Sequence, residues 1–305
     1  MSGPCSNLHS GTMEVNINLT REDGERVLRI ENFTPKDLGW ELFWVEGNFG
    51  SQMPAIKPRG WYKLKLDQTP PRVKNSTLMS FLNYKGELFS YRINDDVLTP
   101  VEPDRSVSLD SPFICITGHQ GSGTSIILKS LRYFGGHAGD DCGDFANRKA
   151  HESVVLRMWH NYVRCGNYDK EIIEEGFYNV MGTYNYQKGK VNIFKDLHMG
   201  DSLGLVNLLP NIKFISVLKH QHKNTLSPEG RKFSQADELE IFKAQNPQLE
   251  GQQMFHLDWN RYFTDMDYCQ KLLNYIGLDI KLDEDGFNRM LKAINFDTNK
   301  LKKDG

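Results

Sequence analysis

A short apolar run that enters a glycine-rich turn constrains this chain more than any other feature. The run Pro112-Phe-Ile-Cys-Ile-Thr leads into Gly118, the turn carries two more glycines at Gly121 and Gly123, and an apolar helical pattern begins at Thr124. Glycines let backbone N–H groups approach a ligand without a Cβ in the way, and a new helix directs its positive end at the same place. The sequence therefore predicts a strand, an anion-binding loop and a helix in succession.

The spacing from Gly118 to Ser125 is similar to that of a P-loop, G-x-x-x-x-G-K-[ST], except that Thr124 stands in the lysine position. A glycine-rich turn alone also serves as a plain connection between a strand and a helix. The function of this turn must therefore be inferred from the motifs around it.

The first third of the chain has a β pattern. The chain has 305 residues, which corresponds to two domains at ~100–200 residues per domain. After a loose tail at 1–12, alternating runs and frequent turns predict a small all-β domain over 13–108, a sandwich or a barrel. The strands are expected at 15–19, 27–30, 40–45, 61–66 and 88–93, and a linker at 99–108. Trp40, Trp44 and Trp61 serve either core packing or a ligand-stacking face.

The remainder, 109–305, alternates strands and helices. The apolar runs predict strands at 112–117, 190–194, 213–218 and 253–257. Helices are expected at 124–134, 151–163, 170–180, 201–209, 236–244, 264–277 and after 283. Thr264 with Asp267 forms a candidate capping box, and Gly277 a C-cap. This alternation predicts an α/β fold with a doubly wound parallel sheet, whose ligands bind at the carboxyl ends of the strands.

Composition excludes several partners. The net charge is -2 and neither half is basic, so we expect no nucleic-acid partner. No run of ~18 apolar residues occurs, so we expect no membrane partner. The five cysteines form no C-x-x-C pair, and the N-terminus lacks a basic and apolar leader. These features predict a cytoplasmic protein, or one assembled into a particle after cytoplasmic synthesis. No metal constellation is apparent, because His220 and His222 lie in a polar loop.

Four motifs in order give a family resemblance. They are the loop at 121–125, the stretch 135–152 with Asn147 and Glu152, the strand end Phe194-Lys195-Asp196, and the strand at 214–218 followed by Lys219 and Ser227. Together they resemble the sulfotransferases that use 3′-phosphoadenosine-5′-phosphosulfate (PAPS), in particular the bacterial and phage-type branch. The resemblance covers roughly 111–278 and implies a P-loop-like, sulfotransferase-like α/β domain.

The resemblance implies site residues. The 5′-phosphosulfate site would comprise Gly118, His119, Gly121, Ser122, Gly123, Thr124 and Ser125. Lys219 and Ser227 keep the family's spacing of eight for the 3′-phosphate. The catalytic candidates are His151, Glu152, Lys195 and His198, with Asp196 as a further possible base. The expected product is adenosine-3′,5′-bisphosphate, and the reaction requires no metal.

Departures from the family pattern leave alternatives open. Gly121 replaces the cation that precedes Ser-Gly-Thr, Lys219 replaces an arginine, and Ala150 replaces a glycine. The first alternative is a sulfotransferase acting on a hydroxyl or amine of a small molecule or glycan. The second is a weakened or inactive protein of the same fold, serving as a structural or binding subunit of an assembly such as a virion. The third, a P-loop nucleotide kinase, is disfavoured by Thr124. The β-domain is a candidate surface for a protein partner or for oligomerisation.

Overall fold

The computed structural model describes residues 7–9, 14–44, 49–68, 77–83, 85, 87–103, 105–118, 122–138, 170–184, 186–195, 209–218 and 235–296. The described residues form two compact units. The first contains the chain up to Val107 together with helix α3, Lys170–Tyr184. The second contains the described residues from Ser108 onward, apart from α3.

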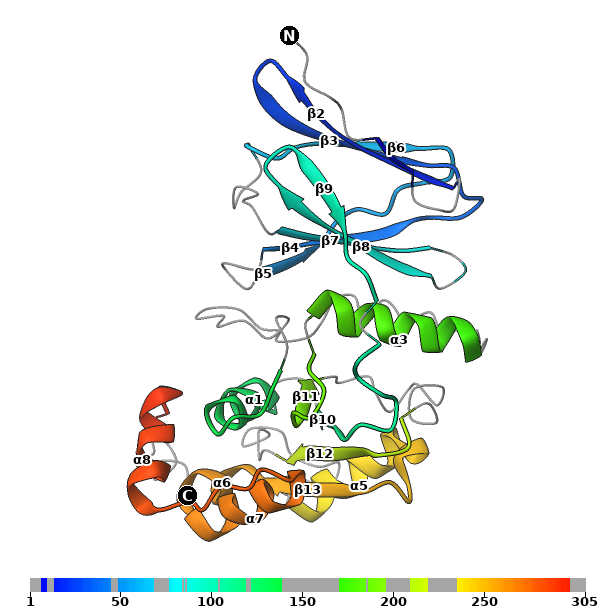
Figure 1. Cartoon of the computed structure of the whole chain (residues 1–305). Coiled ribbons are helices and arrows are strands. Elements are labelled where there is room, and N and C mark those ends of the chain that lie inside the picture. Colours follow the sequence, from blue (N-terminus) through cyan, green and yellow to red (C-terminus); the bar gives the residue numbers. More distant parts are fainter. Residues whose placement is uncertain are drawn as a thin grey trace, which may run out of the picture. The chain divides into compact units, whose positions relative to one another are not determined.

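The first unit is built on two antiparallel sheets, drawn as two layers in Figure 1. The four-stranded sheet has the order β1-β2-β3-β6 and the five-stranded sheet the order β5-β4-β7-β8-β9. The strands of the first are β1 (Asn7–His9), β2 (Val15–Glu22), β3 (Glu25–Asn32) and β6 (Trp61–Lys65). Those of the second are β4 (Gly39–Trp44), β5 (Phe49–Gln52), β7 (Thr77–Leu82), β8 (Leu88–Asn94) and β9 (Val97–Pro100).

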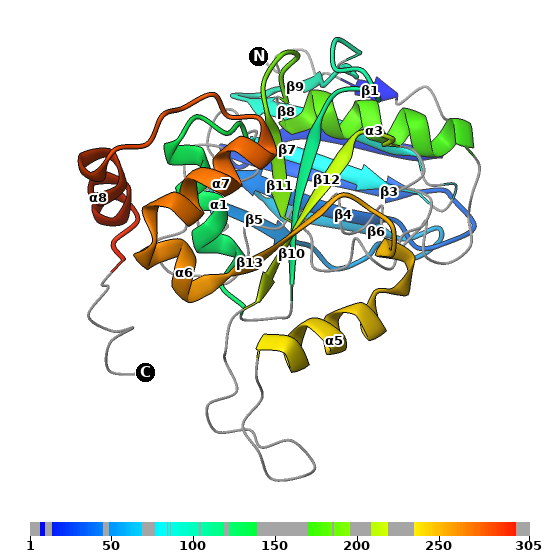
Figure 2. The same ribbon diagram turned by 90° about the horizontal axis from the view of Figure 1, so that it is seen from below.

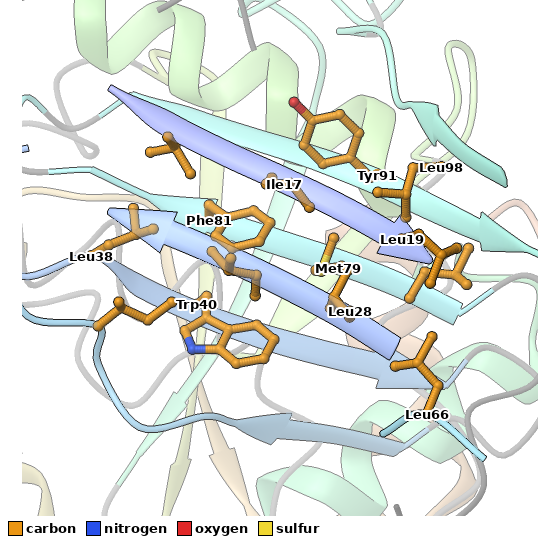
Figure 3. Close-up of a cluster of buried hydrophobic side chains, with 14 residues drawn as sticks. Ile17, Leu19, Leu28, Leu38, Trp40, Leu66, Met79, Phe81, Tyr91 and Leu98 are labelled. Atoms are coloured by element: carbon orange, nitrogen blue, oxygen red, sulfur yellow. The ribbon is translucent and has the colours of Figure 1, made fainter. Parts of the chain in front are cut away.

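The two sheets enclose one apolar core, which makes the unit a sandwich. The alternation of β2 turns Val15, Ile17 and Leu19 inward, as a strand with one buried face requires. Trp40 and Phe81 are neighbours on β4 and β7 and stack within this core (Figure 3). Their ring centroids lie 5.9 Å apart. The all-β prediction for this part of the chain is confirmed. Trp40 belongs to the core, where its indole Nε1 donates to the carbonyl of Pro54 at 2.9 Å.

Four strands of this unit were not expected from the sequence. β7 is buried at all six positions, so it lacks the alternation that marks a half-exposed strand. β1, β5 and β9 are only three or four residues long. The expected linker start at Thr99 is wrong, because β9 extends to Pro100.

Helix α3 confirms the helix predicted at 170–180. It packs on β8. The centroid of its Tyr178 ring lies 4.9 Å from the Arg105 guanidinium carbon.

The second unit contains a parallel sheet with the strand order β11-β10-β12-β13. Its strands are β10 (Phe113–Gly118), β11 (Asn192–Lys195), β12 (Ile212–Leu218) and β13 (Met254–Asp258), and each neighbouring pair is parallel. β10 is buried at all six positions. Such a continuous apolar strand forms where helices cover both faces of a sheet.

Helices lie on both faces of this sheet, which confirms the doubly wound prediction (Figure 2). The helices are α1 (Thr124–Tyr133), α5 (Gln235–Gln245), α6 (Trp259–Thr264), α7 (Met266–Ile276) and α8 (Glu284–Ala293), with a 3₁₀ turn at Pro247–Leu249. α7 covers the face of Lys213, whose Nζ donates to the Tyr275 carbonyl at 2.8 Å. α5 covers the opposite face, where the charge of its Lys243 contributes to lowering the pKa of His256.

The start of α7 differs from the prediction. The N-cap is Asp265, whose carboxylate accepts from the Tyr268 N–H at 3.0 Å. Thr264 instead ends α6 and donates its hydroxyl to the Asn260 carbonyl at 2.8 Å. The capping box of Thr264 and Asp267 is therefore wrong, because an aspartate, itself a strong N-cap, follows directly. Gly277 is the predicted C-cap, at φ 83°.

Two predicted helices cannot be compared with the structure. Residues 151–163 lie outside the described part of the chain, and so does 201–209 except for its last residue, Leu209. Within the part of the chain that the structure describes, no helix combines the length and apolar character needed to cross a bilayer.

Candidate functional site

The loop between β10 and α1 lies at the carboxyl edge of the parallel sheet and is tightly packed at both ends. Gly118 has φ 153°, and a Cβ there would lie 2.7 Å from the Ser122 hydroxyl and 2.9 Å from the Val217 carbonyl. A side chain at this position would displace either the loop or the neighbouring strand. Glycine is therefore required for the chain to turn back on itself.

Gly123 is the N-cap of α1 and adopts a left-handed conformation with φ 85°. A Cβ there would lie 2.1–2.9 Å from ring atoms of Trp259, at the start of α6. Trp259 thus packs directly on the backbone of Gly123 and leaves no room for a side chain there. The sequence analysis missed this residue, and its only signal was its position immediately after an apolar strand.

Among the described residues, no side chain caps the N-terminus of α1. In its first turn, the N–H groups of Ile126 and Ile127 both donate to the Gly123 carbonyl. Thr124 and Ser125 place two hydroxyls at this positive helix end. Such an end attracts an anion, because the helix dipole and the peptide N–H groups act together.

Lys195 brings a cation to the same place from the neighbouring strand. It ends β11, lies opposite Ile116 of β10, and is only 4% exposed. Its Nζ donates to the Ser125 hydroxyl at 3.2 Å. Two positive features, a buried ammonium and a helix N-terminus, therefore lie side by side. An anion placed between them would be stabilised by both, since charge interactions strengthen away from water.

A row of polar side chains crosses the opposite face of the sheet near the same edge. Thr117, Ser216 and His256 are neighbours on β10, β12 and β13. Thr117 Oγ1, Ser216 Oγ, His256 Nδ1 and the nearby Ser122 Oγ are buried, with no hydrogen-bond partner among the described residues. Since buried polar groups are normally paired, we expect these four atoms to have a partner outside the described residues. Burial, and then the charge of Lys243, lower the pKa of His256.

The sequence analysis missed this polar row. Thr117 and Ser216 are single hydroxyl residues within apolar strands, a signal too common to be used alone. The row becomes visible only when the strand register places the three residues side by side.

The structure brings together six of the residues singled out in the sequence. Gly118, Ser122, Gly123, Thr124, Ser125 and Lys195 lie at one edge of the sheet, within and beside the loop. The remaining site residues lie outside the described part of the chain; they are His119, Gly121, His151, Glu152, Asp196, His198, Lys219 and Ser227. Within the described part, no group of three or more His, Cys, Asp or Glu side chains is positioned to hold a metal.

Comparison with known proteins gives a likeness in structure but none in sequence. No protein-family model and no curated protein sequence matches the chain. Among solved structures, the chain is similar to sulfotransferase STF1 from Mycobacterium tuberculosis H37Rv. The two share 13% sequence identity with a TM-score of 0.39, over 65% of this chain and 76% of that chain. A likeness at this level does not assign the chain to a family.

Proposed function

We propose that the α/β unit binds PAPS and transfers its sulfuryl group to a hydroxyl or amine acceptor. The observation that carries the proposal is the buried Lys195 ammonium, 3.2 Å from the Ser125 hydroxyl at the glycine-capped start of α1. The motifs of the sequence add a second anion site, Lys219 and Ser227, for the 3′-phosphate. A nucleotide with phosphates at both ends needs two such sites.

Lys195 has a further role in the proposal. Gly121 stands where related loops carry a cation, so the loop itself lacks the charge that would lie on the leaving group. Lys195 reaches the same helix N-terminus from β11, and therefore supplies a cation from outside the loop. Lys129 lies one helical turn further along α1 and is the poorer substitute.

The chemistry required of the protein is limited. PAPS supplies the sulfuryl group, and sulfur bonds to the acceptor atom as its bond to the phosphate oxygen breaks. The loop amides and Lys195 stabilise the negative charge that develops on that oxygen, and a base removes the acceptor proton. The candidate bases are those of the sequence analysis: Glu152, His198, His151 and Asp196.

A second candidate function follows from the same loop. If Lys195 does not replace the missing loop cation, the unit binds the nucleotide or a protein partner without turnover, as a structural subunit would. A P-loop kinase is the weakest alternative, because Thr124 occupies the position of the phosphate-binding lysine.

The test is transfer of radiolabelled sulfur from PAPS to a panel of phenols, alcohols, amines and oligosaccharides. The proposal predicts transfer by the wild-type protein and a loss of ~10²-fold or more in Lys195→Met, the size expected for one charge-stabilising group. Lys190→Met is the matched control, because Lys190 is exposed and precedes the same strand. Transfer that is unaffected by Lys195→Met would contradict the assigned role. Absence of transfer to every acceptor, with retained nucleotide binding, would favour the non-catalytic alternative.

A further inference from the structure

Two large apolar side chains are exposed on the outward face of the four-stranded sheet in the first unit. Trp61 is 62% exposed and Phe33 is 57% exposed. Trp61 lies opposite Glu31 in the pairing of β6 with β3. The alternation of β3 continues past its end, with Asn32 buried, Phe33 exposed and Thr34 buried. Phe33 therefore lies on the face of Glu31, diagonal to Trp61, at a separation that aromatic side chains span.

Hydrogen bonds and an ion pair hold the polar groups beside these rings. Glu31 pairs with the Arg29 guanidinium at 3.0 Å and accepts from the Asn16 amide at 2.8 Å. Arg29 in turn lies 5.6 Å from the centroid of the Trp61 ring. Arg29 and Asn16 fix the Glu31 carboxylate from two sides. Arg29 also contacts the Trp61 ring, most of which is exposed to solvent.

Three further hydrogen-bond acceptors lie on the same side of the sheet but are buried. Asn16 Oδ1, Asn18 Oδ1 and Glu14 Oε2 are buried and have no partner among the described residues. They alternate along the start of β2, so all three belong to the outward side, next to Glu31. Because these three atoms are buried, the accessible part of the face consists of the Trp61 and Phe33 rings and the Arg29–Glu31 pair.

We propose that this face binds a neutral carbohydrate chain. Aromatic rings with accessible faces pack against the C–H faces of sugar rings, and the partly exposed carboxylate of Glu31 and guanidinium of Arg29 can bond to their hydroxyls. The charges on the face are balanced, since Arg29 pairs with Glu31, Lys63 with Glu22 and Lys65 with Glu25. This balance favours a neutral ligand over a polyanion.

The same arrangement disfavours a protein partner. The centre of a protein–protein interface is apolar and depleted of charge, whereas here the charged pair Arg29 and Glu31 adjoins the two exposed rings. The carbohydrate site is independent of the sulfuryl-transfer proposal, because it uses only residues of the β sandwich.

The test is calorimetric titration of the full chain with neutral oligosaccharides of glucose, N-acetylglucosamine, xylose and mannose. The proposal predicts binding of at least one series, with a blue shift of tryptophan fluorescence as the exposed indole is covered. Trp61→Ala is expected to weaken that binding about tenfold or more, roughly the contribution of one aromatic contact and its buried area. Phe33→Ala should weaken it less. Val97→Ala is the matched control, since Val97 is 52% exposed on the other sheet.

Several outcomes would overturn the proposal. One is the absence of binding to every series at millimolar concentration. Another is binding that Trp61→Ala leaves unchanged. If sedimentation shows self-association that Trp61→Ala removes, and no sugar binds, the face is a protein interface instead. Binding of adenosine-3′,5′-bisphosphate by Trp61→Ala distinguishes loss of this site from failure of the nucleotide proposal.

Discussion

Buried polar groups are fully hydrogen-bonded at Asn32 in the β sandwich, whereas at the carboxyl edge of the parallel sheet several have no described partner. In the sandwich, the Asn32 amide donates to the carbonyls of Lys36, Ile56 and Lys57, and its Oδ1 accepts from the Thr34 N–H at 2.9 Å. At the edge of the parallel sheet, Thr117 and Ser216 are equally buried but keep hydroxyls without a described partner. Saturated networks specify a fold, whereas unused capacity marks a place where something else can bind.

The unpartnered atoms are not scattered. All seven that occur among the described residues fall in two places, the outward side of β2 and the carboxyl edge of the parallel sheet. These are the two regions for which binding is proposed, of a carbohydrate and of a nucleotide. Substitutions that separate paired from unpaired groups therefore test the comparison.

Asn32→Leu should produce the largest effect. The substitution removes four hydrogen bonds from a buried turn and leaves the Thr34 N–H without its partner, while the three carbonyls keep other donors. At about 1 kcal/mol per bond, with the orphaned N–H in addition, we expect a loss of ~3–5 kcal/mol in the free energy of unfolding. Urea denaturation of the full chain, followed by tryptophan fluorescence, measures it. A change below about 1 kcal/mol would show that the paired network contributes little, and would remove one side of the comparison.

Gly123→Ala comes next. The new methyl group meets the Trp259 ring at a left-handed φ, so overpacking and strain together should cost ~2–3 kcal/mol. Gly135→Ala is the matched control: its φ is 91°, but no atom lies within 4 Å of the added Cβ. It should lose only ~1 kcal/mol. Equal losses in the two variants would mean that Trp259 does not fix the loop.

Thr117→Val and Ser216→Ala should have small effects on stability, of about 1 kcal/mol or less, and in the favourable direction. Each removes a buried hydroxyl that has no described partner while keeping the shape of the side chain nearly unchanged. Thermal unfolding without ligand measures the effect. A loss well above 1 kcal/mol in either variant would show that the hydroxyl is paired in the folded protein, and the contrast with Asn32 would fail.

His256 predicts a modest pH dependence. Burial and the charge of Lys243 lower its pKa in the folded state, so the unfolded chain takes up the proton first. Stability contributed by the neutral imidazole is complete above the ordinary histidine pKa of about 6.5, and is lost as the pH falls toward the lower, folded pKa. Urea midpoints at about pH 7.5 and about pH 5 should converge in His256→Gln relative to wild type. An unchanged difference would assign the acid sensitivity to other groups.

Much of the scaffold was predictable from local pattern, and the polar row was not. The apolar strand, the glycine turn and the start of α1 follow one another in the sequence, so the loop was found directly. Lys195 was found because it ends a strand, although its contact with Ser125 depends on which strands pair. The row of Thr117, Ser216 and His256 depends entirely on the register of β12 with β10 and with β13, which are far apart in the sequence. No local pattern contains this information.

The burial of the tryptophans in the sandwich was likewise not predictable from local sequence. Trp40 and Trp61 both occur in runs that predict strands, but one is fully buried and the other mostly exposed. Composition cannot separate them, because the difference arises from which side of the pleat each residue occupies. Core packing is therefore the correct interpretation for Trp40, whereas ligand stacking by the exposed Trp61 stays a proposal.

Calorimetric titration with adenosine-3′,5′-bisphosphate, with AMP as the control, tests the central claim most directly. The account predicts micromolar binding that requires the 3′-phosphate, is weakened in Lys195→Met and is retained in Lys190→Met. Failure of adenosine-3′,5′-bisphosphate to bind, or equal binding of the two nucleotides, would contradict the claim that the carboxyl edge of the parallel sheet is a PAPS site.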